Sequence, residues 1–180
     1  MPDPRFRKTV VYIWRHDVSG AAGVVINKRC QQPDFRHICN EGIIHRLPKV
    51  NHPVYYGGPI LTNVVGVLHS TDFILNSTNT LTEDKVGFTL DRKMLEVIAK
   101  GQGPKNKLIT LGMANWTTGQ LEEELEHPRN PAMSWLIMDY DEKFVFGQLD
   151  EDKPDDLWER SVSEAIRAKT REITSKVFKD

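Results

Sequence analysis

Cysteine is scarce in this sequence, with only Cys30 and Cys39 among 180 residues. Small secreted domains held together by disulfides contain far more, so a disulfide scaffold is excluded. Long apolar runs are also absent, because no stretch approaches the roughly 18–20 residues that a membrane-spanning helix needs. Residues 1–8 lead directly into a strand pattern, without the apolar core of a secretory signal. We therefore expect a cytoplasmic protein with no membrane association.

An excess of one charge is missing as well. Lysine and arginine number 24 against 25 aspartates and glutamates, which gives a formal net charge of −1. Proteins that bind nucleic acid concentrate basic residues, because neutralised phosphates supply much of the affinity. No helix-turn-helix pattern is recognisable. We therefore expect no sequence-specific binding of nucleic acid.

The potential metal ligands have unfavourable spacing. Cys30, His37, Cys39 and His45 carry suitable atoms, but they form no Cys-x2-Cys pair and no His-x3–5-His pair. The acidic run at 122–126 is most simply a solvated helix face. We predict no metal ion and no other cofactor, and we assign no catalytic residue.

The sequence does contain many strand patterns. Hydrophobic residues make up 39% of a length that suits one domain. The predicted strands are residues 9–14, 22–27, 54–56, 64–69, 85–90, 107–113, 134–138 and 143–148. The first two form a hairpin, and 85–90 is expected at a sheet edge. Because several strands follow one another without a helix between them, we predict an α+β fold whose mixed, largely antiparallel sheet packs against helices.

Caps and apolar spacing predict the helices. A short helix is expected within residues 28–53, and a second follows the N-cap Asp91 and ends near Gly101. Its apolar face consists of Met94, Leu95, Ile98 and Ala99. A third helix starts with a capping box, in which the Thr117 hydroxyl accepts from the backbone of Gln120 and the Gln120 side chain reaches back to Thr117.

A final helix is predicted after Pro154. The side chains on its apolar face are Leu157, Trp158, Val162, Ala165 and Ile166. Residues 169–180 form a charged tail that either extends this helix, through Ile173 and Val177, or frays. We therefore predict one domain over residues 1–168, followed by this tail.

The junction from Asn115 to Gln120 is a candidate ligand site. The free N–H groups at the start of a helix attract anions. Trp116 adds a stacking face and Thr118 a hydroxyl, so a phosphate or nucleotide suits this loop. The alternative, which we favour, is that Thr117 and Gln120 satisfy these N–H groups themselves and that Trp116 packs in the core.

Two further features accompany this junction. Gly57 and Gly58 indicate a tight turn or a close approach of two backbones. His69 ends a strand beside a serine and an aspartate, but neighbours in sequence rarely form a catalytic triad, so a hydrogen-bonded structural histidine is favoured.

The complete set of candidate ligand-binding residues is Asn27, Gly57, Gly58, His69, Trp116, Thr118 and Gln120. Convergence of these residues on one cleft would indicate a ligand-binding enzyme, whereas packing would indicate an interaction protein.

Several motifs occur together in a recognisable order. They are Asp3-Pro4-Arg5-Phe6, the run GAAGVVINK at 20–28, Gly57-Gly58-Pro59, Leu68-His69-Ser70, and residues 111–125. Together they resemble the YqgE/AlgH family of small bacterial proteins, over residues 3–167. The resemblance implies a compact α/β sandwich. Members of this family are often labelled uncharacterised proteins or transcriptional regulators, and they have no agreed biochemical activity.

One departure from the family pattern bears on function. Many relatives carry a cysteine where this sequence has Trp14, so the oxidation sensing suggested for that thiol is not implied here. The resemblance implies a non-enzymatic regulatory or interaction protein, whose partner is an unidentified protein or a small anionic ligand. The alternative is a small-molecule or nucleotide-binding enzyme that uses the Gly57-Gly58 turn, His69 and the loop at 116–120.

Overall fold

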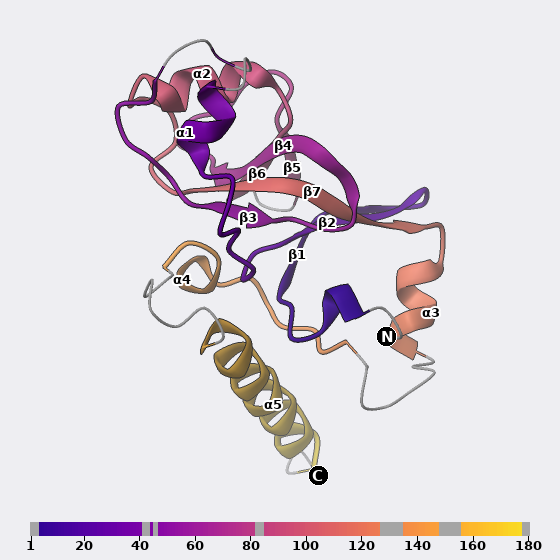
Figure 1. The fold of residues 1–180 in the computed structure, drawn as a ribbon. Coiled ribbons are helices and arrows are strands. Elements are labelled where there is room, and N and C mark those ends of the chain that lie inside the picture. The colour runs from indigo at the N-terminus through magenta and orange to yellow at the C-terminus, as the bar shows by residue number, and fades with distance from the viewer. Residues whose placement is uncertain are drawn as a thin grey trace.

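A computed structural model describes residues 4–40, 44, 47–81, 85–126, 135–147 and 156–177. In these segments seven strands form one sheet (Figure 1). They are β1 (Val11–Asp17), β2 (Gly20–Val25), β3 (Val54–Tyr56), β4 (Ile60–Ser70), β5 (Asn79–Leu81), β6 (Val86–Thr89) and β7 (Lys107–Thr117). The order is β1-β2-β7-β4-β6-β5, and β3 pairs with β7. Only the β3–β7 pairing is parallel among these strands, so the predicted α+β class with a largely antiparallel sheet is confirmed.

Helices cover both faces of the sheet (Figure 1). They are the 3-10 helix η1 (Pro4–Phe6) and the helices α1 (Phe35–Ile38), α2 (Arg92–Ala99), α3 (Gln120–Glu126), α4 (Glu142–Val145) and α5 (Asp156–Val177). On one face, α1 and α2 pack on Val67 and Ile109. On the other face, α4 and α5 contribute to a cluster with Leu68 and Leu108. Successive residues of β4 and β7 therefore serve opposite cores, as the period-two geometry of a strand requires.

The two ends of the sheet approach each other, so that it is almost a barrel. The end strand β1 lies beside β5, the strand at the other end. Trp14 occupies an irregularity in β1, where the register with β2 shifts between Ile13 and Arg15. Its indole stacks on Phe88 of β6, with ring centroids 4.6 Å apart and planes at 22°. Aromatic packing therefore joins the end strand β1 to β6, the strand next to β5.

The segment after β3 crosses directly over β7. Strands β3 and β4 pair with opposite edges of β7, so residues 57–59 carry the chain from one edge to the other. A β-carbon on Gly57 would lie 2.2 Å from the carbonyl oxygen of Gly112, and one on Gly58 2.2 Å from the carbonyl carbon of Met113. Only glycine allows two backbones to approach so closely. These glycines are therefore required by the crossing itself.

The predictions based on local signals are confirmed. The residues at 11–17 and 20–25 form the expected hairpin. Asp91 caps α2 by accepting from the backbone N–H of Lys93, and Gly101 adopts a φ of 74° after the helix. The expected apolar face of this helix, Met94, Leu95, Ile98 and Ala99, is buried.

Other predictions were wrong in extent or position. The expected edge strand at 85–90 is β6, which lies between β4 and β5. Strand β4 begins four residues before the expected Val64, and β7 continues through four residues that were expected to be a loop. Strand β5 begins at Asn79, between the predicted strands 64–69 and 85–90, where no strand was predicted. The short helix expected within residues 28–53 is α1, which contains only residues 35–38.

The region before α5 also differs from expectation. Residues 143–145 of the predicted strand belong to α4, because the carboxylate of Asp141 accepts from the backbone N–H groups of Lys143 and Phe144 and caps a helical turn. Residues 135–138, predicted as a strand, have no regular structure. Pro128, after which no helix can continue unbroken, and Pro154, where the final helix was expected to start, lie outside the described residues.

Helix α5 is longer than its packed part. Leu157 and Ala165 are buried as predicted, but Ile166 is 55% exposed, so the apolar face ends earlier than expected. The amine of Lys8 lies 5.2 Å from the centroid of the Trp158 ring and ties the start of α5 to the N-terminal segment. No helix in the described part of the chain is both long and apolar enough to cross a membrane.

Candidate functional site

His69 lies at the end of β4 and is completely buried. Its Nδ1 is 2.9 Å from the carbonyl oxygen of Ser70, and its Nε2 is 2.8 Å from the hydroxyl of Thr89. A carbonyl can only accept, so Nδ1 carries the proton and Nε2 accepts from Thr89. Thr89 in turn lies 2.8 Å from the Thr78 hydroxyl, which accepts from the backbone N–H of Leu75. His69 is thus the end of a fixed chain of internal hydrogen bonds.

The electrostatics of His69 agree with this neutral form. Burial lowers the pKa of the imidazole, and the Ser70 carbonyl and Asp72 oppose that effect only in part. The hydroxyl of Ser70 donates to the Asp72 carboxylate, 2.5 Å away, rather than to the histidine. The serine, histidine and aspartate in this stretch therefore lack the order of contacts that a catalytic triad needs.

Asn27 follows β2 and is 98% buried, with 2% of its surface exposed. Its side-chain oxygen accepts from the backbone N–H of Val10 at 2.8 Å. Its amide nitrogen donates to the carbonyl oxygen of Lys8 at 2.9 Å. The side chain therefore holds the N-terminal segment against the end of β2.

Trp116 is buried near the end of β7, with 2% of its surface exposed, as we favoured. Its ring centroid lies 6.4 Å from that of Phe6 and 6.1 Å from that of Trp135. Both indole N–H groups donate to the same carboxylate oxygen of Glu124, at 3.2 Å from Trp116 and 2.9 Å from Trp135. The other oxygen accepts from the Gln120 amide at 3.2 Å. The Glu124 carboxylate, which is partly buried, therefore accepts from three donors of this chain.

The start of α3 is capped differently from the prediction. The side-chain oxygen of Gln120 accepts from the backbone N–H of Thr117 at 3.0 Å, which confirms the reach-back contact. The Thr117 hydroxyl, however, donates to that same oxygen at 3.2 Å instead of serving as the acceptor we expected. Thr117 is still the last residue of β7, so its extended backbone places the hydroxyl beside the amide.

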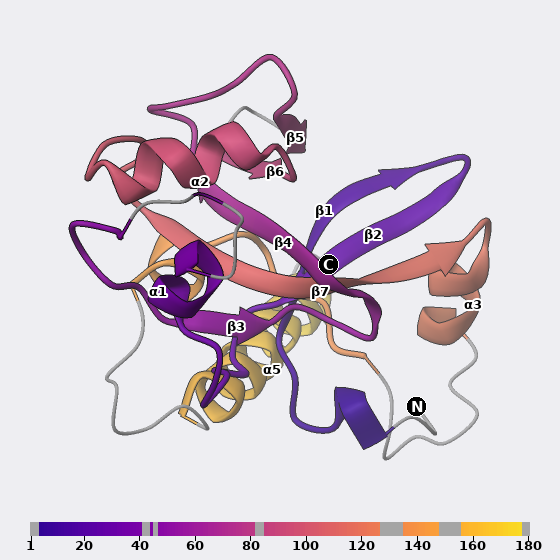
Figure 2. The same cartoon turned by 45° about the horizontal axis from the view of Figure 1, so that its top comes forward.

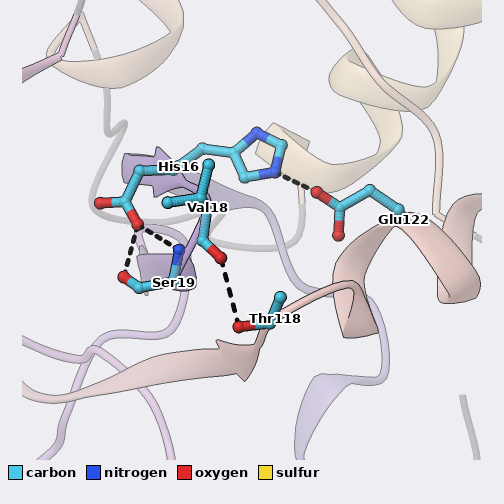
Figure 3. A network of polar contacts seen from close by, with 6 residues as sticks. His16, Val18, Ser19, Thr118 and Glu122 are labelled. Carbon is cyan, nitrogen blue, oxygen red and sulfur yellow. Dashed lines mark hydrogen bonds and ion pairs between the residues drawn. The ribbon is translucent and has the colours of Figure 1, made fainter.

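The exposed members of the predicted site, Thr118 and Gln120, lie in a surface network of polar contacts, part of which Figure 3 shows. It joins the tip of the β1–β2 hairpin to the β7–α3 turn. The Thr118 hydroxyl donates to the carbonyl oxygen of Val18 at 3.3 Å, and His16 Nε2 lies 2.5 Å from Glu122 Oε1. The pKa of Glu122 is held below its usual range, first by a hydrogen bond from the backbone N–H of Glu122 itself and then by the contact with His16. The side chain of Val18 is 93% exposed at the tip. We call residues 16–19 and 118–122 the hairpin ridge.

The seven candidate residues do not line one cleft. Asn27, His69 and Trp116 are buried and bonded to different parts of the chain, and Gly57 and Gly58 form the crossing over β7. Thr118 and Gln120 are exposed. None of the seven lines a cavity that lies beside α1 in the described part of the chain.

That cavity has a volume of about 560 Å³ and lies between residues 29–34 and residues 51–54. Its lining residues are Arg29, Cys30, Gln31, Asp34, Asn51, His52, Pro53 and Val54. Sequence reasoning missed it, because the lining comes from the segment before α1 and the segment before β3. Neither segment has a periodic pattern or a motif that predicts a cavity.

The groups in this cavity are mostly inactive or already bonded. Asp34 accepts from the Asn51 amide at 2.8 Å and lies 2.6 Å from His37, and these contacts hold its pKa far below the usual range. Burial raises the pKa of the Cys30 thiol and lowers that of His52. At neutral pH the thiol is therefore protonated and the imidazole uncharged, unlike the thiolate of a reactive cysteine. The described residues hold no cluster of three histidine, cysteine or acidic side chains placed to bind a metal.

The fold and these internal contacts define a small α+β domain built on one strongly curled sheet. The chain belongs to the family described as AlgH-like, whose model matches residues 1–168. It is 36% identical over 163 residues to a "UPF0301 protein" of Bradyrhizobium sp., which covers 86% of this chain and 73% of the relative. A "UPF0301 protein" of Nitrobacter hamburgensis is 35% identical over 161 residues, covering 85% and 72%.

A solved structure agrees with this assignment. The solution structure of the AlgH protein from Pseudomonas aeruginosa superposes with a TM-score of 0.65 at 30% identity. The match covers 85% of this chain and 78% of that one. The names of these relatives state no biochemical activity, so function has to be argued from the site.

Proposed function

We propose that this chain is a non-enzymatic, cytoplasmic interaction protein that acts in regulation by binding another protein through the hairpin ridge. One observation carries the proposal: the most distinctive residues of the sequence are used to build the fold. Asn27, His69 and Trp116 have their polar atoms satisfied by this chain's own groups. A catalytic residue has to meet substrate, and these side chains are enclosed.

The hairpin ridge has the features of a recognition surface. It projects from the curled sheet as an arm formed by β1, β2 and the end of β7 (Figure 2). Its contacts tie two loops together, so the exposed Val18 is presented from an ordered support. A single exposed valine among polar residues on an ordered support suits a protein partner, because little conformational freedom is lost on binding.

The proposal is tested by site-specific photocrosslinking in cells. A photoreactive amino acid at Val18 should give a discrete crosslinked species, identified by mass spectrometry. The same amino acid at Ile74, which is 58% exposed in the loop before β5, is the matched control and should not give that species. Identical products from both positions, or none from Val18, would contradict a partner at the ridge.

The enzyme alternative is tested on the purified protein. ATP, ADP, GTP and inorganic phosphate are added separately, and the melting temperature is measured. We expect no shift, because the N–H group at the Thr117 junction is already bonded to Gln120. A saturable rise in melting temperature would favour the ligand-binding alternative, because a ligand that binds only the folded state stabilises it.

A further inference from the structure

The second half of α5 projects from the packed part of the domain. Helix α5 contains 22 residues, but Ala165 is the last one with a buried side chain in the part whose side chains are described. All residues from 166 to 171 are exposed. The backbone remains helical to Val177, so about 18 Å of helix extends beyond the packed part. Figure 1 shows this end of α5 pointing away from the sheet.

This projecting half is basic. Arg167, Lys169 and Arg171 are exposed within six residues. Arg167 lies 3.5 Å from Glu164, but 70% of its side chain remains exposed. Arg167 and Arg171 are one turn apart and therefore lie on the same face. An isolated helix of about 12 residues is marginal in water, so a partner along this face would stabilise it.

The same chain carries two exposed side chains of opposite charge that are also about one helical turn apart. On α3, Glu123 and Glu126 are exposed and three residues apart, so they too lie on one face. Arginine forms bidentate pairs with carboxylates, and two such pairs one helical turn apart would fix the register of two helices. Each molecule has one basic helix and one acidic helix, so two copies can satisfy both contacts around a twofold axis.

We infer that the projecting half of α5 docks on α3 of a second copy of this chain, with Arg167 and Arg171 facing Glu123 and Glu126. The contact forms twice in a symmetric dimer. The inference goes beyond the proposed function and does not depend on it, because the residues differ from the exposed tip of the hairpin ridge.

Light scattering after size exclusion and sedimentation velocity test the inference on the full chain. The wild type should have twice the monomer mass of 20.6 kDa at low salt. Its dimer dissociation constant should rise at least tenfold between about 50 mM and about 500 mM salt, because exposed charge pairs are screened. A wild type that stays monomeric at low salt overturns the inference.

Charge exchange then assigns the contact. The variants R167E/R171E and E123R/E126R should each be monomeric, because each places like charges at both contacts. An equimolar mixture should form a heterodimer, because both contacts are again complementary. Circular dichroism and melting curves verify that each variant folds. The double variant K93E/K100E, which changes two exposed lysines on or beside α2, is the control and should dimerise like the wild type.

Two other outcomes would also overturn it. A dimer that survives R167E/R171E must use a different interface. A monomeric wild type whose arginines bind duplex DNA or anionic phosphatidylserine vesicles would show that the basic helix serves an anionic polymer or membrane instead.

Discussion

The interior of the domain and the hairpin ridge use similar residues for opposite purposes. In the interior, His69 makes a buried hydrogen bond with Thr89, and the buried Trp116 donates to the partly buried Glu124. At the ridge, His16 and Thr118 make comparable bonds at the surface, beside the exposed Val18. An unusual residue in a sequence can therefore serve the internal packing and hydrogen bonding of the fold instead of a ligand site. The comparison predicts that interior changes affect stability and that ridge changes leave it nearly intact.

The largest expected effect concerns Trp116. Replacing it by Ala should lower the free energy of unfolding by about 3–5 kcal/mol, because a large aromatic side chain leaves a cavity in a packed cluster. Urea denaturation of the variant and the wild type measures this difference. A Trp116→Ala variant as stable as the wild type would remove the distinction between interior and ridge.

The crossing over β7 gives the next largest effect. Gly58 has a φ of 151°, and an added β-carbon would overlap the backbone of Met113. Gly58→Ala should therefore cost about 1–3 kcal/mol or more, the range for forced overpacking. Gly119→Ala is a useful control. It also has a positive φ, of 74°, but its β-carbon would meet no atom within 4 Å. Equal losses for both variants would show that backbone strain, rather than the crossing, is responsible.

His69 should make stability depend on pH. Its pKa is lowered in the folded state by burial, so the unfolded chain binds the proton more readily. Stability is therefore complete above the unfolded pKa of about 6.5 and falls as the pH drops below that value. His52 contributes in the same direction, because burial lowers its pKa too. Denaturation between about pH 5 and 8 should show a shallower pH dependence for His69→Gln than for the wild type; an unchanged dependence would contradict this role.

The smallest effects belong to the ridge and the adjoining cap. Val18→Ser should change stability by less than about 0.5 kcal/mol, as is usual for exposed positions. Thr117→Ala should also cost only about 0.5 kcal/mol, because the Gln120 side chain still accepts from the Thr117 backbone N–H. Gln120→Ala removes that contact and should cost more than Thr117→Ala. Thermal melts of the three variants rank these changes, and the reverse ranking would mean that the hydroxyl carries the cap.

Features that depend on interactions between residues close in sequence were mostly predicted correctly, whereas features that depend on distant residues were not. Helix α2 was predicted with its cap and buried face, because Asp91 and the apolar spacing are local signals. The position of β6 inside the sheet depends on β5, which pairs with it from a short segment without a strong strand pattern. Helix α4 was taken for a strand because its apolar residues suited either structure, and the cap at Asp141 was overlooked.

The site was predictable only where local chemistry sufficed. Burial of Trp116 follows from its place between an apolar strand and a helix, and the contact from Gln120 to Thr117 follows from their spacing. Trp116 and Trp135 approach Glu124 only in the folded chain, so the sequence did not predict that one carboxylate accepts from both indoles. The same holds for the hairpin ridge, where Val18 and Thr118 are 100 residues apart.

The stacking of Trp14 on Phe88 has a consequence for internal motion. The described strands run in an open order from β1 to β5, so side chains rather than a backbone ladder close the sheet. We call the boundary between β1 and the β5–β6 end of the sheet the seam. Opening the seam breaks aromatic contacts but none of the strand pairings. Local opening along it should cost far less free energy than global unfolding, and amide protons of β1 that face the seam should exchange with deuterium before those of β7, which is paired on both edges.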